Sequence, residues 1–371
     1  MPKSLSLKDP IHGISASHGF NGEPIQIETE GFYTTNDGSK FIELVEMLSE
    51  QLGLSRLHTS TVDHLLFFLN RKNEGILYLN ELKFILTITY GRDIQKGEAV
   101  LEDHIVDVDR LELVGAGGSP VAVPDDCGVI FLFSLGWRKG LYFNFQPLPG
   151  PNGNVSDYST RFGRVYGQLQ FQEKTSLDEQ QWKQLSEWGW FPFSCLTKSE
   201  LREIGSWSRQ NRFPPDVFTK ICQNFKARLI SRVDNWKRRP ELEAHKDFID
   251  RAVEAYLKDD YLGTITFLYP RIEGLMWEKT KAWSKQTTLV ENWVKDREPA
   301  SLLLPARFKE YLLTVYFKKF DLPKNEVPLS RHTVGHGFSR VSDYTFENAT
   351  LAFMVFDQMY EFLPPMPSNE T

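Results

Sequence analysis

The segment RHTVGHGFSR, residues 331–340, brings Arg331, His332 and His336 within six positions. A histidine transfers protons near neutral pH, and an arginine holds anionic oxygens with a rigid fork of donors. Arg331 and His336 are five positions apart and can converge on one phosphate across a helical turn or a tight loop. The spacing predicts phosphodiester chemistry without a metal, with the arginine stabilising charge and the histidine acting as acid or base.

Two other interpretations of this segment stay open. Histidines at i and i+4 occur in the zinc motif HExxH, but Thr333 stands where that motif has its glutamate. Asp343 is the best third ligand nearby, and Gly335 and Gly337 weaken a helix here, so we expect no metal. The plainest alternative is a polar loop that begins a helix after Pro328.

Two further motifs carry weaker chemistry. GAGGSP at 115–120 has Pro120 in place of the third glycine of a dinucleotide-binding loop, which favours a surface turn, and we expect no cofactor. EDHIVDVDR at 102–110 would put Asp107 and Asp109 on one face of a strand as metal ligands, but no second acidic pair accompanies it. A solvated edge strand is the favoured interpretation.

Bulk composition limits the class of protein. With 371 residues the chain is long enough for two domains, and 41% hydrophobic residues argue against extensive disorder. No apolar run approaches the roughly 20 residues of a membrane-spanning helix. The N-terminus lacks the apolar core of a secretory signal, and three scattered cysteines suggest a reducing compartment. We therefore expect a cytoplasmic protein without a membrane partner.

Positive charge gathers in one stretch of an acidic chain. Residues 202–239 hold ten Lys and Arg against three Asp and Glu, although the whole chain has a net charge of −6. Aromatic residues interleave with these cations, a pattern typical of RNA contact but also of a helix with a buried aromatic face. The side chains expected to face solvent and attract RNA are Arg209, Arg212, Lys237, Arg238 and Arg239.

Periodicity divides the chain into two halves. Before about residue 175, short β-branched and aromatic segments predict strands, at 24–30, 83–90, 104–114, 127–135 and 141–147. A helix is predicted over 41–53, and 61–71 is a candidate for another. We place the domain boundary at 196/197, giving a β-rich sensing or targeting domain (1–196) and a helical domain (197–371). The predicted fold class is α+β.

The helical half has clear beginnings and ends. Thr197 and Glu200 form a predicted capping box, and Pro215 opens a helix that reaches about residue 236. Further helices are predicted over 242–283, with a break at Gly263 or Pro270, over 306–319 and over 344–363. The last one is apolar nearly all round, which indicates either the centre of a bundle or a surface covered by a partner chain.

These residues resemble a known family. RHTVGH fits the Rx4–6H motif of HEPN domains (higher eukaryotes and prokaryotes nucleotide-binding), in which a polar residue such as His332 follows the arginine. The stretch 261–277 is similar to a helix of HEPN-like bacterial proteins linked to abortive infection. The likeness covers about residues 200–365, and FLFSLGWRKGLYFNFQPL at 131–148 resembles an uncharacterised bacterial domain. The resemblance implies a helical bundle, with Arg331, His332 and His336 as catalytic residues and Glu273 in support.

The family resemblance also implies a function. HEPN enzymes are metal-independent endoribonucleases, hydrolases that often serve in antiviral defence or as toxins and often act as homodimers. We accordingly expect RNA as a partner, a homodimer formed through the helical domain, and a phage or regulatory partner at the N-terminal domain. A degenerate bundle that only binds RNA or protein is the main alternative, and a plain dimerisation scaffold is the third.

Overall fold

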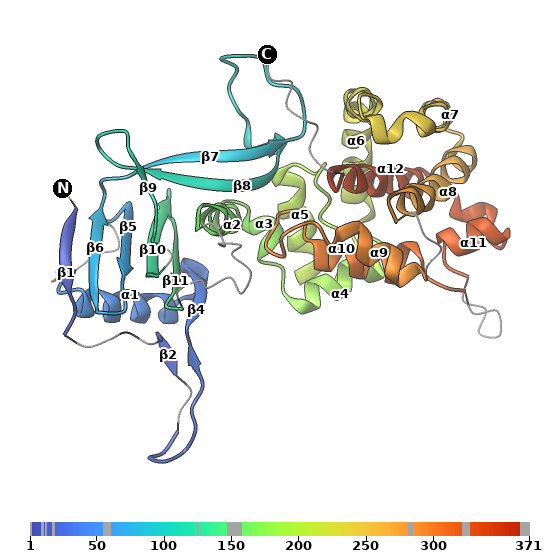
Figure 1. The fold of residues 1–371 in the computed structure, drawn as a ribbon. Helices are drawn as coiled ribbons and strands as arrows, with labels where there is room; N and C mark the ends of the chain where they lie inside the picture. Colours follow the sequence, from blue (N-terminus) through green and yellow to red (C-terminus); the bar gives the residue numbers. More distant parts are fainter. Residues whose placement is uncertain are drawn as a thin grey trace. The chain divides into compact units, whose positions relative to one another are not determined.

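A computed structural model describes residues 2–8, 11, 13–16, 19–54, 61–124, 126–146, 158–280, 285–320 and 327–363. The chain forms two compact units (Figure 1): unit 1 comprises residues 1–88 and 108–170, and unit 2 comprises residues 89–107 and 171–371. The fold is mixed, with an N-terminal sheet region and C-terminal helices, as predicted. The predicted boundary at 196/197 falls inside unit 2, which also takes in residues 89–107.

A six-stranded antiparallel sheet is the centre of unit 1. Its strand at His64–Leu69 overturns the candidate helix at 61–71, because Leu65 and Phe67 enter one core while Leu66 and Phe68 enter another. A strand buried on both faces has no alternation and cannot be told from a buried helix by periodicity. The strand order is β1 (Lys3–Ser6), β6 (Glu74–Leu79), β5 (His64–Leu69), β10 (Gly128–Leu135), β11 (Arg138–Asn144) and β4 (Glu30–Thr34).

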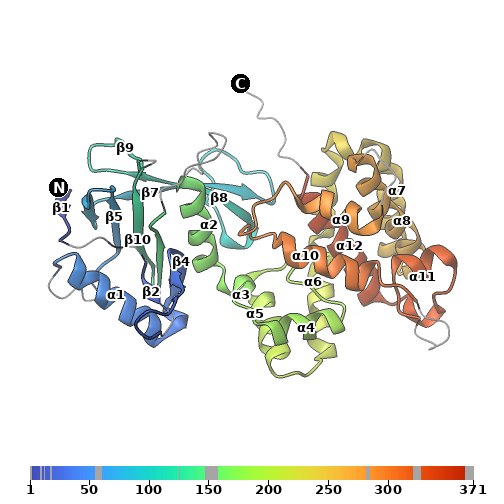
Figure 2. The ribbon, with the colours of Figure 1, turned by 60° about the horizontal axis from the view of Figure 1, so that its bottom comes forward.

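One helix packs on each face of this sheet (Figure 2). α1 (Ser39–Gln51) confirms the helix predicted over 41–53, and its apolar stripe packs on one face. α2 (Tyr158–Gln170) packs on the other. Gly163 of α2 lies so close to the backbone of Arg110 that an added Cβ would be 2.7 Å from Arg110 Cα. The bare glycine surface is therefore what allows this approach.

Two smaller ladders complete the strands. β7 (Lys83–Tyr90), β8 (Ile105–Val114) and β9 (Pro120–Val121) form a three-stranded sheet, and β2 (Ser15–Ala16) pairs with β3 (Ile27–Glu28). The segment GAGGSP is the turn between β8 and β9, where Gly115 N donates to Ser119 O at 3.0 Å. The prediction of a turn there is confirmed.

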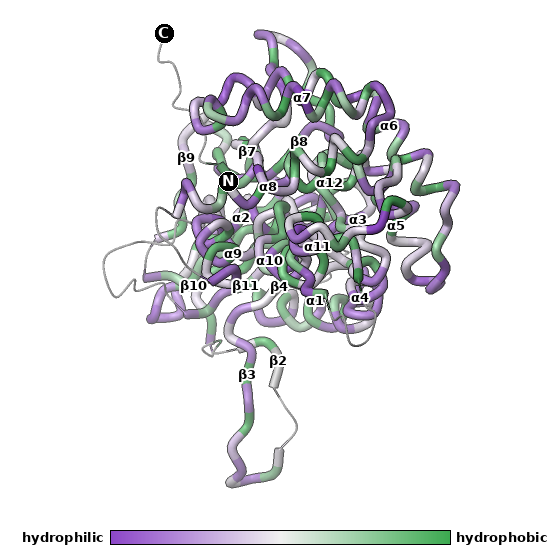
Figure 3. Tube along the Cα trace, turned by 90° about the vertical axis from the view of Figure 1, so that its right-hand side faces the viewer, coloured by the Kyte–Doolittle hydropathy of each residue, from purple (hydrophilic) through white to green (hydrophobic). Residues whose placement is uncertain are grey.

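Unit 2 is helical around one hydrophobic core. The capping box of Thr197 and Glu200 is confirmed at the start of α5, and Pro215 begins α6 as predicted. Figure 3 shows hydrophilic and hydrophobic residues alternating along α7, as in an amphipathic helix. The helices are α3 (Gln172–Thr175), α4 (Glu179–Glu187), α5 (Lys198–Arg209), α6 (Pro215–Lys237), α7 (Lys246–Leu257), α8 (Tyr261–Thr280), α9 (Gln286–Val294), α10 (Pro305–Tyr311), α11 (Arg331–His336) and α12 (Phe346–Glu361).

The break predicted at Gly263 or Pro270 lies elsewhere, because α8 runs through both residues. α7 ends before Asp259, whose φ of 61° is left-handed and cannot continue a right-handed helix. Asp260 then caps the next helix, its Oδ1 accepting from Gly263 N at 2.8 Å. The short polar residues of the link stop one helix and start the other.

α12 is buried on nearly every side by its own unit. Its polar side chains therefore find partners inside the protein. Asp357 accepts from Arg232 Nη1 at 2.7 Å and from Trp236 Nε1 at 3.0 Å, while Thr350 shares a 2.5 Å hydrogen bond with Tyr256. Of the two interpretations of this apolar helix, the central position in a bundle is the correct one.

Further charged groups lie inside unit 2. Burial, followed by repulsion from Asp357, raises the pKa of Glu361 to about 8. Burial lowers the pKa of Lys174 to about 8. Asp107, expected on a solvated edge, is 1% exposed and accepts from Ser301 Oγ at 2.6 Å and Leu302 N at 3.0 Å, so that expectation is wrong.

Gly163→Ala should destabilise unit 1. The new methyl group meets the Arg110 backbone, and such overpacking costs about 1–3 kcal/mol in the free energy of unfolding. Chemical denaturation measures this loss. Gly205→Ala in α5 is the matched control, because its Cβ would meet Leu177 no closer than 3.4 Å and alanine favours a helix. Equal effects of the two substitutions would contradict the close approach.

Glu361 should make the folded state less stable as pH rises. Its pKa is about 8 in the fold against an ordinary 4.5, so the folded state binds the extra proton between these values. The free energy of unfolding should fall from pH 5 to 8 by up to about 4 kcal/mol relative to Glu361→Gln. Lys174, with a pKa of about 8, begins to lose its proton only at the top of this window, and it does so in both proteins. Parallel pH profiles for the two proteins would contradict this assignment.

Candidate functional site

α11 is a six-residue helix with a capping residue at each end. Ser330 caps its beginning, where its Oγ accepts from Thr333 N at 3.3 Å, and the buried Thr333 hydroxyl donates to Pro328 O at 2.8 Å. Gly337 ends it with a φ of 72°, which lets Phe338 N reach Thr333 O at 2.8 Å. Local capping thus fixes Arg331, His332 and His336 on one rigid turn, and Gly337, expected to weaken a helix, is its stop signal.

Glu273 of α8 holds Arg331 by an ion pair through the guanidinium Nε. Both side chains are largely buried, with 26% of Arg331 and 11% of Glu273 exposed. An arginine has five N–H donors. Among the residues that the structure describes, its two Nη groups have no hydrogen-bond partner, so these donors are open to an anion.

Gly335 leaves the space in which the Arg331 guanidinium lies. A Cβ at this position would collide with Arg331 Nη1. Arg331 and Gly335 are four positions apart on α11, so the guanidinium lies along the face of this short helix. Gly335, expected only to weaken a helix, therefore makes room for the arginine, a role for which no sequence signal exists.

His332 is half-buried and tied to a distant residue. Its Nε2 lies 3.1 Å from Gln286 Oε1 and 3.0 Å from Gln286 Nε2, at the beginning of α9. Burial lowers the pKa of His332, and the charge of Arg331 lowers it further. The imidazole is therefore neutral at neutral pH. Gln286 lies 46 positions away, and no pattern in the sequence points to it.

His336 is exposed and stacks in parallel with His332. The ring centroids are 6.3 Å apart and the planes differ by 3°. The Phe320 ring lies 6.1 Å from His336, and Phe338, 43% exposed, lies 4.7 Å from Phe320. The structure thus brings the four predicted site residues together, with His336 as the member most open to a substrate.

The five predicted RNA-contacting cations do not form one surface. Arg209 and Arg212 are exposed, and the Arg212 guanidinium lies 5.6 Å above the Trp207 ring. Lys237 pairs with Asp250, and Arg238 pairs with Asp93. Arg239 is 5% exposed, so the expectation that it faces solvent is wrong. Only the first two keep unpaired positive charge at the surface of the described chain.

The arrangement can bind an anion and transfer a proton. Arg331 offers its Nη donors, and His336 offers an exposed imidazole from the same short helix. Within the described ranges, no three His, Cys, Asp or Glu side chains gather as a metal site would require. No described helix has the length and apolarity needed to cross a membrane. Comparisons with family models, curated proteins and solved structures find no match to this chain.

Opposite charges around His332 predict opposite changes in its pKa. Arg331→Gln should raise the pKa, since it removes a cation and leaves Glu273 unopposed. Glu273→Gln should lower the pKa, since it removes the anion that favours the protonated ring. NMR titration of the His332 ring measures both. An unchanged pKa in both variants would show that burial alone sets it.

Proposed function

We propose that unit 2 is a HEPN-like helical domain and that the protein is a metal-independent endoribonuclease of the defence or toxin type. The observation that carries this proposal is the joint placement of Arg331, His332 and His336 on one capped turn, with two guanidinium nitrogens unpartnered among the described residues. The helical surroundings agree with it, since α11 leads into the long buried helix α12.

The reaction needs an oxyanion partner and two proton transfers. The ribose 2′-oxygen attacks phosphorus and loses its proton, the bond to the 5′-oxygen breaks, and that oxygen takes up a proton. The products are a 2′,3′-cyclic phosphate and a 5′-hydroxyl. Arg331 would hold the charge that grows on the non-bridging oxygens, and His336 would serve as the acid or base.

A second copy of the chain would complete the site. One exposed histidine cannot act as acid and base in the same step, and His332 is tied to Gln286. α12 gives no support for a dimer, because its own unit buries it. The support comes instead from Phe338 and Val341, which follow α11 and are 43% and 82% exposed. Exposed apolar side chains beside the site would suit a twofold contact.

Substitutions at the site test the nuclease. Arg331→Ala should slow RNA cleavage by about 10²–10³-fold, as expected for loss of a donor to a developing oxyanion. His336→Ala should slow it by about 10²–10⁴-fold. Arg251→Ala on the exposed face of α7 is the matched arginine control and should cleave like the parent. The assay follows 2′,3′-cyclic ends on a labelled RNA, with thermal unfolding to verify that each variant folds.

Gly335→Ala separates positioning from loss of a chemical group. It retains every reacting side chain but pushes the guanidinium from its place. Slower cleavage with the normal 2′,3′-cyclic product is the expected result. If Arg331→Ala and His336→Ala cleave as fast as the parent, the nuclease assignment is wrong.

One observation favours the alternative of a non-catalytic RNA-binding module. Arg212 and Phe213 lie in the turn after α5, beside the half-buried Trp207 near the end of that helix, and Phe213 is 46% exposed. Aromatic rings beside unpaired cations are a combination that suits single-stranded RNA. Such a module would bind RNA in a salt-dependent way, lose affinity on Arg212→Ala, and yield no cyclic ends.

A further inference from the structure

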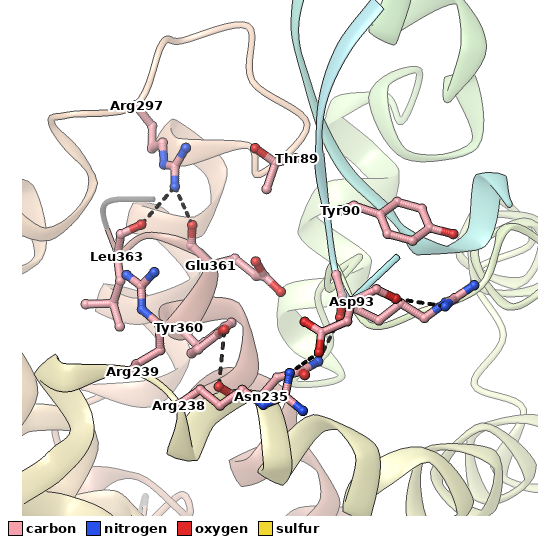
Figure 4. A pocket seen from close by; sticks show the side chains of 12 residues that line it. Thr89, Tyr90, Asp93, Asn235, Arg238, Arg239, Arg297, Tyr360, Glu361 and Leu363 are labelled. Atoms are coloured by element: carbon pink, nitrogen blue, oxygen red, sulfur yellow. Dashed lines mark hydrogen bonds and ion pairs between the residues drawn. The ribbon is translucent and has the colours of Figure 1, made fainter. Parts of the chain in front are cut away.

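A polar pocket of about 210 Å³ lies within unit 2 (Figure 4). Residues 89–93 form one wall, and the C-terminal ends of α6 and α12 form the others. Asn235 Nδ2 donates to Gly91 O at 3.1 Å and holds the first wall to α6. Four arginines line the space: Arg92, Arg238, Arg239 and Arg297.

Arg297 differs from the other three arginines. Each of those has a carboxylate partner, respectively Glu98, Asp93 and Glu241. Arg297 makes no ion pair with any residue in the described part of the chain. Its Nη2 donates to the carbonyl oxygens of Glu361 at 2.6 Å and Leu363 at 3.1 Å. Among the described residues no acceptor meets its Nε or Nη1, so these donors remain for another acceptor.

Glu361, at the end of α12, adds a neutral hydrogen-bond donor to the lining of the pocket. The pKa of this buried carboxyl is raised to about 8, chiefly by burial. At pH 7 it is mostly protonated, so it can donate an O–H and does not repel an anion. Asp93 is the other carboxylate of the lining, and Arg238 neutralises it. The positive charge of Arg297 is therefore not cancelled within the pocket.

Capping of α12 accounts for part of this arrangement only. A cation near the last carbonyls of a helix is a common stabilising device. That role uses one nitrogen of Arg297 and needs neither three more arginines nor a protonated carboxyl beside it. The surplus of donors, arriving from three different segments, is what a multivalent oxyanion requires.

We propose that this pocket binds the phosphate group of a small phosphorylated compound, with Arg297 as its principal anchor. A phosphate accepts hydrogen bonds in several directions, which matches donors on residues 89–93, just after the end of α6, and on the segment that carries Arg297. The volume is below the roughly 300–1,000 Å³ of drug-sized ligand sites, so the pocket suits a small phosphorylated group and not a large ligand. This inference does not depend on the nuclease assignment.

Calorimetric titration of the full chain at pH 7 tests the site, with inorganic phosphate, AMP and adenosine as probes. Phosphate and AMP should bind with a Kd below about 1 mM, and adenosine should not bind. Arg297→Gln retains donors for the α12 carbonyls but removes the charge, and should weaken phosphate binding by at least about tenfold. Arg297→Lys should lose less. Arg251→Gln is the control for general charge and should bind like the parent.

The probes also separate the sources of the phosphate. Tighter binding of AMP than of inorganic phosphate would indicate a nucleotide, and equal binding would indicate the phosphate alone. If Arg297→Gln does not fold, Arg238→Gln, at an exposed position, should still weaken binding by about threefold or more. No binding by the parent, equal affinity in Arg297→Gln, or equal binding of adenosine would overturn the proposal. RNA cleavage that survives these variants leaves the nuclease assignment untouched.

Discussion

The enclosure of α12 is the constraint on which unit 2 depends. A helix surrounded by protein must place each polar group against a partner, because an unpaired buried polar group costs about 1–3 kcal/mol. Asp357 meets this requirement through α6, and Gln358 does so by accepting from Ser194 N at 2.7 Å and donating to Leu303 O at 3.2 Å. These bonds attach segments far apart in the sequence to one helix. They also set the position of the residues that lie just before and just after it.

The ion pair between Arg331 and Glu273 follows the same logic with a different result. A largely buried carboxylate on α8 needs a cation, and Arg331 supplies it through Nε. A partner that used both Nη groups would leave the arginine with a purely structural role, as buried pairs often have. Within the described chain the two Nη groups have no partner. One guanidinium can therefore be held by Glu273 through Nε and still bind an anion through its Nη groups. The carboxylate weakens the field of the arginine while it orients the side chain.

Local signals in the sequence predicted much of this arrangement, and long-range partners set the rest. The capping box of Thr197 and the helix that begins at Pro215 depend on neighbouring residues, so they could be found by inspection. Glu273 was named through the family resemblance. By contrast, Gln286 meets His332, and Arg239 is buried, only because tertiary folding brings distant segments of the chain together. The double burial of β5 erased the alternation that identifies a strand.

The two histidines are constrained differently, and this decides what a single copy of the site can do. His332 has its Nε2 engaged by Gln286 and a lowered pKa, so it stays neutral and its ring orientation is set. His336 is exposed, with no hydrogen-bond partner among the residues that the structure describes. It alone can turn toward a substrate, yet strand cleavage needs one group to remove a proton and another to deliver one. A nuclease built on this turn therefore needs a second group that can donate or accept a proton. The His336 of another copy of the chain would supply such a group without any other kind of residue.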